Sequence, residues 1–440
     1  MKSLINPFLR NSTPPEQAII DRKRVSKFFS SLIAEGGALE IYGERGIGKS
    51  LMLKYISSPS VDLTLNNFQN YIFVFLNCSD SVHPKTASQF WFQCTKTLDR
   101  KLEDSPIKEK CKALLQRIEE GAELGANDFH DVLDVAAEAN KRIVLVLDDF
   151  DALIRTDTEH LDSSRTFLQG LRSLTTRDFN KANLVLATRY SLQKLCKPLA
   201  VQNISPFENG FTSCRLQLFR EDDILKLLHR IEQTDQPLFT SSESRYIAYL
   251  SGYHPQLAEM VASEIFDHRI DVGAPLNDLT PVGEKFQSVA SPVFERFWEG
   301  SSPDEQMLLM LIALQKLKGK VTNSKYDLSD ITSIFIQKER ELIELNARGL
   351  LNRTQTNPPT WEIFSPIFEW WILKEIESST PEQLDERRRV WGSLLTQKQA
   401  DKIGQTLDFL KNNKDSIIAF GRLIIKLTGK DLDLPMLGGG

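Results

Sequence analysis

The sequence predicts a doubly wound parallel α/β domain with a phosphate-binding loop, followed by several smaller helical segments. Three observations predict this fold. Gly43–Ser50 match the pattern G-x-x-x-x-G-K-[ST], apolar strand-like runs alternate with helical segments, and one of these runs ends in Asp148 and Asp149. Alternation of strands with helices favours a parallel sheet that helices cover on both faces.

The residues around the loop are those that a phosphate-binding loop requires. Ala38–Tyr42 has the pattern of a buried strand, and Leu51–Ile56 that of a helix. Glycines let successive backbone N–H groups converge on an anion at a helix N-terminus, whose dipole also favours negative charge. We expect Lys49 to reach the β- and γ-phosphates and the Ser50 hydroxyl to bind Mg²⁺. The predicted nucleotide-binding residues here are Gly43, Glu44, Arg45, Gly46, Ile47, Gly48, Lys49, Ser50 and Leu51.

The pattern therefore predicts that the protein binds a nucleoside triphosphate. The alternative is a glycine-rich turn without a ligand, which the strand and helix flanks disfavour. Four further strand-like runs follow. They are Tyr71–Asn77, Arg142–Leu147, Asn183–Ala187 and Arg215–Leu218. The first is continuously apolar, as expected of a parallel strand that is covered on both faces.

Composition limits the other possibilities. A chain of 440 residues suggests two to four domains, and its net charge of −5 provides no general basic surface for nucleic acid. The five cysteines show no C-x-x-C spacing, which disfavours a disulfide framework or a zinc site. The sequence has no apolar run of membrane-spanning length and no signal-peptide pattern, so we expect a cytoplasmic protein.

Changes in periodicity and composition divide the chain into five parts. They are an N-terminal arm (1–24), a P-loop NTPase domain (25–219), a helical lid (220–285), a winged-helix domain (286–378) and a C-terminal helical tail (379–440). We expect the arm to lie across the P-loop domain and Asp271–Gly283 to be a linker. Leu350–Arg353 and Trp361–Phe364 have the pattern of the hairpin in a winged helix.

The acidic residues after the third strand are the candidates for metal binding and catalysis. Asp148 is expected to bind Mg²⁺ through water, and Asp149 to polarise the attacking water. The alternative is that the acids only terminate the strand. Asp151 lies off the same face and is expected to cap the next turn.

The fourth strand ends in a candidate phosphate sensor. Thr188 and Arg189 are expected to approach the γ-phosphate, because the ends of parallel strands meet at one edge of the sheet. A guanidinium binds phosphate oxygens in a bidentate way and can report whether that phosphate is present. The alternative is a surface arginine beside a loop.

Motifs spread over residues 5–375 resemble the STAND class of AAA+-related P-loop ATPases, in particular bacterial proteins described as AAA-like or ATP-binding. Besides the P-loop, the matching motifs are N-P-F (Asn6–Phe8), F-W (Phe90–Trp91), L-R-S-L (Leu171–Leu174), T-R (Thr188–Arg189), S-P-F-x-N (Ser205–Asn209), G-x-H-P (Gly252–Pro255) and W-x-[LI]-F-S-P-x-F (Trp361–Phe368). Two departures are notable. Only Arg22 remains of a G-R-x-x-E box, and Asp149 stands where many relatives carry Glu, which implies slow hydrolysis.

This resemblance implies a sheet of order 5-1-4-3-2 and a switch that uses ATP, ADP and Mg²⁺. The ADP state is expected to be closed. ATP is expected to favour an open form that homo-oligomerises or engages a protein partner through the tail, in bacterial signalling or antiviral defence. The resemblance also implies that Pro255 packs against adenine with His254 nearby. The alternative is that Gly252 and Pro255 only end one helix and start the next.

Two other functions remain open from the sequence: an initiator-like or transposition-like ATPase that acts on DNA, and a structural ATP-binding scaffold without turnover. The candidate recognition helix, Gln337–Arg348, carries three basic and three acidic residues. A helix that tracks phosphates should be clearly basic, so DNA is expected to be an unlikely partner. In the tail, Ile417, Phe420, Ile424 and Leu427 form an apolar stripe, either packed on the winged helix or docking another protein.

Overall fold

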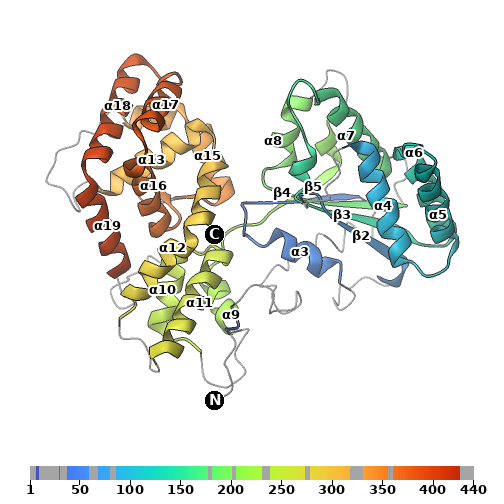
Figure 1. Ribbon diagram of the computed structural model, residues 1–440, viewed down its shortest axis with the longest axis horizontal. Coiled ribbons are helices and arrows are strands. Elements are labelled where there is room, and N and C mark those ends of the chain that lie inside the picture. Colours follow the sequence, from blue (N-terminus) through green and yellow to red (C-terminus); the bar gives the residue numbers. More distant parts are fainter. Residues whose placement is uncertain are drawn as a thin grey trace. The chain divides into compact units, whose positions relative to one another are not determined.

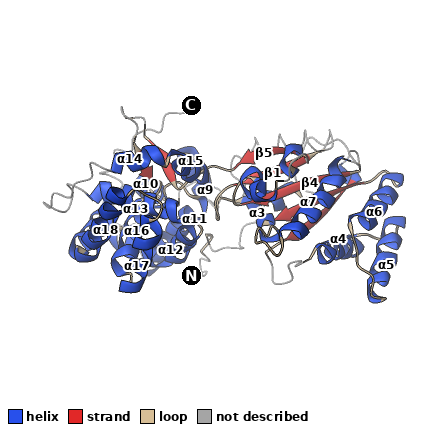
Figure 2. Cartoon of the chain, turned by 90° about the horizontal axis from the view of Figure 1, so that it is seen from above, coloured by secondary structure: helices blue, strands red, loops and turns tan. Residues whose placement is uncertain are grey.

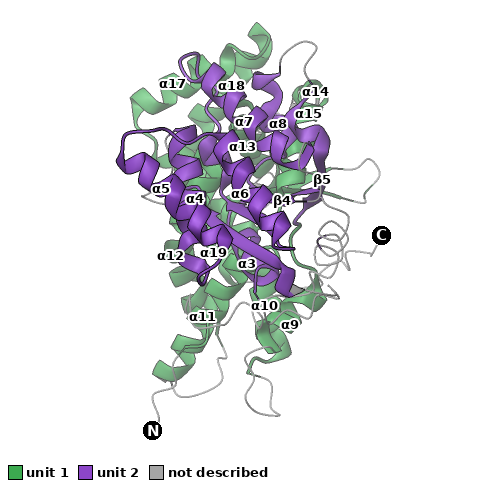
Figure 3. Ribbon diagram, turned by 90° about the vertical axis from the view of Figure 1, so that its right-hand side faces the viewer, with its two compact units in different colours: residues 1–13, 217–440 green, residues 14–216 purple. Residues whose placement is uncertain are grey.

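The computed structural model of the chain describes residues 6–8, 29, 37–58, 68–79, 86–176, 181–200, 205–229, 238–272, 278–317, 331–354, 356 and 360–426. The chain forms two compact units (Figure 3). We call residues 14–216 the P-loop unit, and residues 1–13 with 217–440 the helical unit.

A five-stranded sheet of order β2-β3-β4-β1-β5 forms the centre of the P-loop unit (Figure 1). The strands are β1 (Ala38–Tyr42), β2 (Tyr71–Asn77), β3 (Arg142–Asp148), β4 (Ala182–Thr188) and β5 (Phe211–Arg215). All neighbouring strands pair in parallel, which confirms the predicted order 5-1-4-3-2. The register sets Asn77 beside Asp148 and Tyr42 beside Thr188, so the polar strand ends meet at one edge.

The predicted fifth strand, Arg215–Leu218, is displaced from the observed one. The structure begins β5 at Phe211, and the strand exposes Thr212 and Ser213. β5 is an edge strand, so part of it faces solvent and its sequence is less apolar than that of a central strand. The predicted strand lies too far toward the C-terminus because Leu216 and Leu218 are apolar. In the structure Leu216 follows the strand, and its N–H donates to the carbonyl of Tyr42.

Helices cover both faces of the sheet (Figures 1 and 2). They are α3 (Lys49–Ile56), α4 (Ala87–Lys101), α5 (Pro106–Glu119), α6 (Ala126–Glu138), α7 (Leu161–Thr176) and α8 (Leu192–Cys196). Alternate residues of β3, such as Ile143 and Leu147, share one core with Trp91 of α4 and Leu171 of α7. Because strand side chains alternate between faces, Asp148 lies on the opposite face, which α3 covers.

The helical unit contains α9 (Glu221–His229), α10 (Ser241–Ser251), α11 (Pro255–Val272), α12 (Thr280–Glu299), α13 (Pro303–Leu317), α14 (Ile331–Gln337), α15 (Glu339–Arg348), α16 (Pro366–Ser378), α17 (Pro381–Gly392), α18 (Gln397–Asn412) and α19 (Lys414–Lys426). A two-stranded antiparallel hairpin, β6 (Leu351–Arg353) and β7 (Trp361–Ile363), follows α15. The expected linker Asp271–Gly283 is too long at both ends, because α11 continues to Val272 and α12 begins at Thr280. No helix in the described ranges has both the length and the hydrophobicity needed to cross a bilayer.

α16 is the centre of the helical unit, where it packs against α10, α12, α13, α18 and α19. Phe368 of α16 lies between the rings of Phe294 and Phe364, with centroid distances of 5.2 and 5.7 Å. His254 is 1% exposed, and its ring lies 5.4 Å from that of Phe297. His254 therefore belongs to an aromatic core that joins the start of α11 to α12 and the hairpin.

The C-terminal tail contributes to this core. Ile417, Phe420 and Ile424 are buried, and α19 packs on α12 and α16. The structure therefore supports the first of the two interpretations of the stripe, packing within the chain; Leu427 lies outside the described residues. The close approach of α19 to α16 requires a glycine, because a Cβ at Gly421 would lie 2.0 Å from the ring of Trp370.

The N-terminal arm does not lie where the sequence suggested. The Asn6 side chain donates to the backbone carbonyl of Ser263 at 3.2 Å and to the Asp267 carboxylate at 2.8 Å, both in α11. The ring of Phe8 lies 5.5 Å from that of Phe239. The described part of the arm thus packs on the helical unit rather than across the P-loop domain, because Asn6 finds its hydrogen-bond partners on α11. Arg22 lies outside the described residues.

Candidate nucleotide-binding site

The loop between β1 and α3 has the backbone conformation that its glycines predict. Gly46 and Gly48 have φ angles of 75° and 102°, in the left-handed region that glycine tolerates best. Gly43 is needed for a close approach, since a Cβ there would lie 2.9 Å from the carbonyl oxygen of Leu216. The Gly43 N–H donates to the carbonyl of Thr188, so the end of β4 holds the start of the loop.

Lys49 is held against the loop. Its ammonium donates to the carbonyl of Gly43 at 2.9 Å and to that of Glu44 at 3.2 Å. An ammonium has three N–H donors, so this arrangement keeps capacity for a phosphate oxygen. Burial lowers the pKa of Lys49, while the charges of Glu44, Asp151, Asp149 and Asp148 oppose that shift. Four carboxylates therefore favour the charged form of this buried ammonium, which is the form that binds phosphate oxygens.

Ser50 and Asp148 form a pair suited to Mg²⁺. The Ser50 hydroxyl hydrogen-bonds the Asp148 carboxylate, and Asp148 is 3% exposed. Burial, the largest effect, raises the pKa of Asp148 and the charge of Asp149 raises it further, against the hydrogen bond from Ser50. A hydroxyl and a carboxylate at one point are the oxygen ligands that Mg²⁺ prefers, so these two residues fit the ion.

Asp149 follows β3 with a φ of 49°, a left-handed conformation that Asp tolerates better than most residues. Its Oδ2 lies 2.8 Å from the hydroxyl of Ser79. The same hydroxyl lies 3.0 Å from the side-chain oxygen of Asn77, which ends β2. Ser79 and Asn77 were not among the residues predicted from the sequence. One signal in the sequence could have identified them. The apolar run Tyr71–Asn77 has a polar end, which lies beside the acidic end of the next strand in the sheet.

The structure places Arg189 at the loop, where its side chain lies against an acid. Its Nε is 2.7 Å from Oε1 of Glu44, and the two side chains are 11% and 1% exposed. The same Glu44 oxygen accepts the backbone N–H of Arg45 at 3.0 Å. The sequence predicts Glu44 only as a loop position, because an acid inside a phosphate-binding loop is not part of the motif.

Asp151 does not cap the next turn. Its carboxylate accepts the backbone N–H of Arg189 at 3.3 Å, and its charge acts on Lys49. Burial raises its pKa. The short helix after β3 (Phe150–Leu153) turns the Asp151 side chain back toward the end of β4, so that it joins the two strand ends.

Thr188 and Pro255 are the two remaining predicted positions. Thr188 ends β4 and is fully buried, and its carbonyl supports the loop through Gly43. Pro255 is the first residue of α11 in the helical unit. The resemblance implies that Pro255 contacts adenine. Such a contact would join the two units, and it stays a prediction.

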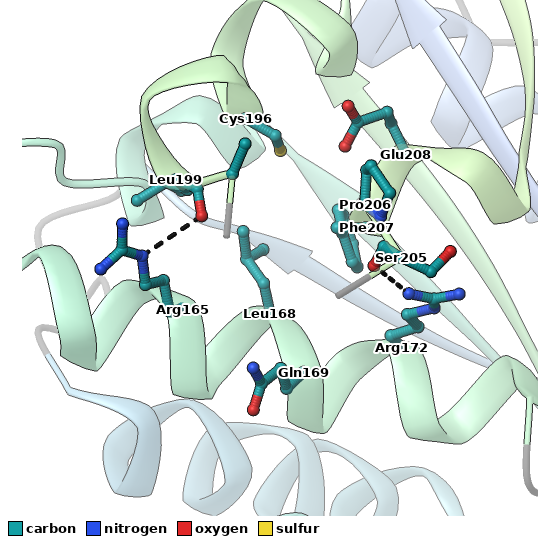
Figure 4. A pocket seen from close by; sticks show the side chains of 11 residues that line it. Arg165, Leu168, Gln169, Arg172, Cys196, Leu199, Ser205, Pro206, Phe207 and Glu208 are labelled. Carbon is teal, nitrogen blue, oxygen red and sulfur yellow. Dashed lines mark hydrogen bonds between the residues drawn. The ribbon is translucent and has the colours of Figure 1, made fainter. Parts of the chain in front are cut away.

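A small hollow in the P-loop unit lies between α7 and residues 205–208 (Figure 4). Its volume is about 70 Å³, which is too small for a nucleotide. Arg165 and Arg172 line it and donate to the carbonyls of Leu199 and Ser205. Phe207 also stacks on Phe150, the residue after Asp149, at 6.2 Å. The motifs at 171–174 and 205–209 thus hold each other together and support the end of β3.

Residues 22–186 match the family model described as the AAA ATPase domain. No curated protein matches the chain in sequence. Among solved structures, the Aeropyrum pernix ORC2 protein is 15% identical with a TM-score of 0.54, over 93% of this chain and 98% of that one. The Walker-type ATPase of Pyrococcus abyssi is 14% identical with a TM-score of 0.52, over 80% and 96%. The chain has the fold of AAA+ P-loop ATPases.

These comparisons overturn one expectation from the sequence. DNA was judged an unlikely partner from the mixed charge of Gln337–Arg348. The solved structures similar to this chain include the Aeropyrum pernix ORC1 protein in complex with DNA, at 10% identity and a TM-score of 0.42, over 83% of this chain and 95% of that one. The expectation that DNA is an unlikely partner is withdrawn. A charge count over one helix is a poor guide, because phosphate contacts can come from any part of a surface.

Proposed function

We propose that this chain is an ATP-driven switch of the STAND type that hydrolyses ATP slowly. The observation that carries the proposal is the convergence of Lys49, Ser50, Asp148, Asp149 and Arg189 around one phosphate-binding loop. A P-loop with a cation, a metal site, a candidate base and an arginine has each part that phosphoryl transfer to water needs.

In the proposed mechanism the N–H groups of the loop and Lys49 hold the phosphates, and Ser50 and Asp148 hold Mg²⁺. The metal ion neutralises charge on the β- and γ-phosphates when it is bound. Asp149 accepts a proton from the attacking water, and Ser79 orients its carboxylate. An Asp has a shorter reach than the Glu of many relatives, and this supports slow turnover.

The switch requires a difference between the ATP and ADP states. We propose that Arg189 senses the γ-phosphate and that the helical unit responds. Within that unit, α13, α14 and α15 followed by the hairpin β6–β7 have the element order of a winged helix, which we assign as the regulatory part. ADP favours a closed form in this scheme, and ATP favours an open form that oligomerises or engages a partner.

A nucleotide titration followed by mass measurement tests this proposal. Purified full-length protein is expected to bind both Mg-ADP and Mg-ATP, to release phosphate slowly, and to gain mass only with ATP or the slowly hydrolysed analogue AMP-PNP. Unchanged mass in all nucleotides would contradict the switch. Nucleotide binding without phosphate release would favour a scaffold that binds ATP without turnover.

DNA is the second candidate partner, because the expectation against it has been overturned. The measurement is a titration of a fluorescent duplex at several salt concentrations in ADP and in AMP-PNP. An affinity that falls steeply with salt and depends on the nucleotide would assign the chain to the ATPases that act on DNA.

A further inference from the structure

The carboxylate of Glu44 lies among the groups that a polyphosphate would use. Its Oε1 is 2.7 Å from Nε of Arg189 and 3.0 Å from the backbone nitrogen of Arg45, which belongs to the phosphate-binding loop. The ammonium of Lys49 donates to the Glu44 carbonyl at 3.2 Å. Glu44 thus places a negative charge of the protein's own beside the two cations of the nucleotide site.

This carboxylate depends on its partners. Glu44 is 1% exposed, and a buried carboxylate is costly unless it is paired and hydrogen-bonded. Arg189 supplies the guanidinium, at 11% exposure, and the loop supplies an N–H group. Any second anion that approaches Arg189 must either draw it away from Glu44 or share it with Glu44. Drawing Arg189 away leaves the buried carboxylate of Glu44 unpaired, and sharing Arg189 brings two negative charges together. Both routes cost free energy, because charges are poorly solvated and like charges repel strongly where water is excluded.

We propose that Glu44 is an internal competitor of the γ-phosphate for Arg189 and thereby sets how strongly the site prefers ATP over ADP. This inference rests on the proposed function of the same site. ADP lacks a γ-phosphate and leaves the Glu44–Arg189 pair intact, whereas ATP must disturb it. The pair therefore biases the site toward ADP and lowers the affinity for ATP.

Removing the charge of Glu44 tests the inference. Glu44→Gln retains the shape and an acceptor for the Arg45 N–H, but it removes the negative charge that pairs with Arg189. Because contacts to a charged group are stronger than contacts to a neutral one, we expect AMP-PNP to bind about five- to tenfold tighter, with a smaller change for ADP. Isothermal titration of the full chain with Mg-ADP and Mg-AMP-PNP gives the ratio of the two dissociation constants.

The control variants separate this effect from a general change of charge. Glu103→Gln removes the same charge from an exposed position just after α4 and is expected to leave the ratio unchanged. In an Arg189→Ala background, Glu44→Gln is expected to leave the ratio unchanged as well, because the guanidinium for which Glu44 would compete has been removed. A ratio that still rises in that background would overturn the inference.

Other outcomes of these titrations also decide the role of Glu44. A Glu44→Gln variant that loses preference for AMP-PNP would show that Glu44 positions Arg189 rather than competes for it, and an unchanged ratio would show no role. If Glu44→Gln does not unfold cooperatively on heating, Glu44→Ala gives the same readout. If the wild type binds neither nucleotide, or Lys49→Ala binds both as tightly as wild type does, the proposed function fails instead.

Discussion

The hydroxyl of Ser50 hydrogen-bonds the carboxylate of Asp148, and this contact joins the first turn of α3 to the end of β3. It brings together a residue of the loop motif and a residue that ends a distant strand. Asp148 is nearly inaccessible to solvent, so its negative charge is poorly solvated unless a cation is present. The site thus holds a carboxylate that favours metal binding at the expense of the stability of the nucleotide-free protein.

Asp148→Asn should therefore stabilise the nucleotide-free protein and abolish Mg²⁺-dependent nucleotide binding. Burial raises the pKa of Asp148 in the folded state, so the folded state favours the protonated form. The contribution of Asp148 to the free energy of unfolding therefore falls as the pH rises from about 4, the ordinary pKa of an aspartate, through its raised pKa in the folded state. The gain in Tm over wild type should be larger at neutral than at acidic pH. Asp104→Asn, at an exposed position, is the control and should show no such gain.

Lys49→Ala should weaken ATP binding by more than about 100-fold, because charge-assisted hydrogen bonds to the terminal phosphates are lost. Titration with Mg-ATP measures the loss. Lys54→Ala removes an exposed lysine of the same helix and should bind as wild type does. Wild-type affinity in Lys49→Ala would show that the phosphates bind elsewhere.

Asp149→Asn should keep nucleotide affinity and lower the rate of phosphate release by about 10²–10⁴-fold, the usual contribution of a general base. It should also trap whatever assembly ATP promotes. Asp151→Asn is the comparison, because Asp151 lies beside Arg189 and acts on Lys49. Unchanged turnover in Asp149→Asn with slow turnover in Asp151→Asn would assign the base to Asp151.

Arg189→Ala should weaken ATP binding relative to ADP binding by about 10- to 150-fold, the loss of one charge-assisted hydrogen bond to phosphate. The ratio of the two dissociation constants is the quantity to measure, because Glu44 also loses its ion-pair partner and this affects both nucleotides. Equal losses for ADP and ATP would make Arg189 a structural residue. ATP-driven changes in mass should decline together with the ratio.

Gly421→Ala should destabilise the helical unit by about 1–3 kcal/mol, since the added methyl group forces Trp370 or α19 to shift. Thermal unfolding measures the effect. Gly404→Ala in α18 is the matched control, because a Cβ there meets no neighbouring atom, and it should be neutral or slightly stabilising. The same packing predicts that deleting residues 381–440 uncovers α16 and destabilises the helical unit, while the loop motif at 43–50 stays intact.

The sequence by itself determined the local elements of the nucleotide site. The glycine spacing at 43–48 specifies a loop that only residues without a Cβ tolerate, and the apolar run 142–147 followed by acids specifies a central strand with a polar end. Periodicity and backbone conformation depend on neighbours along the chain, so β1, β2 and β3 could be predicted almost to the residue. The parallel order of the strands then predicted that Asp148 and Arg189 lie at the same edge as the loop.

Only the tertiary structure decided which polar groups pair. Glu44 with Arg189 and Ser79 with Asp149 are contacts between residues far apart in the sequence, and neither is encoded in a local pattern. The hydrogen bonds of Asn6 to α11 are of the same kind, and the close packing of Gly421 on Trp370 likewise joins residues far apart in the sequence. Such pairs depend on how the helices and strands pack, because a buried charge or hydroxyl takes whichever partner that packing brings within about 3 Å.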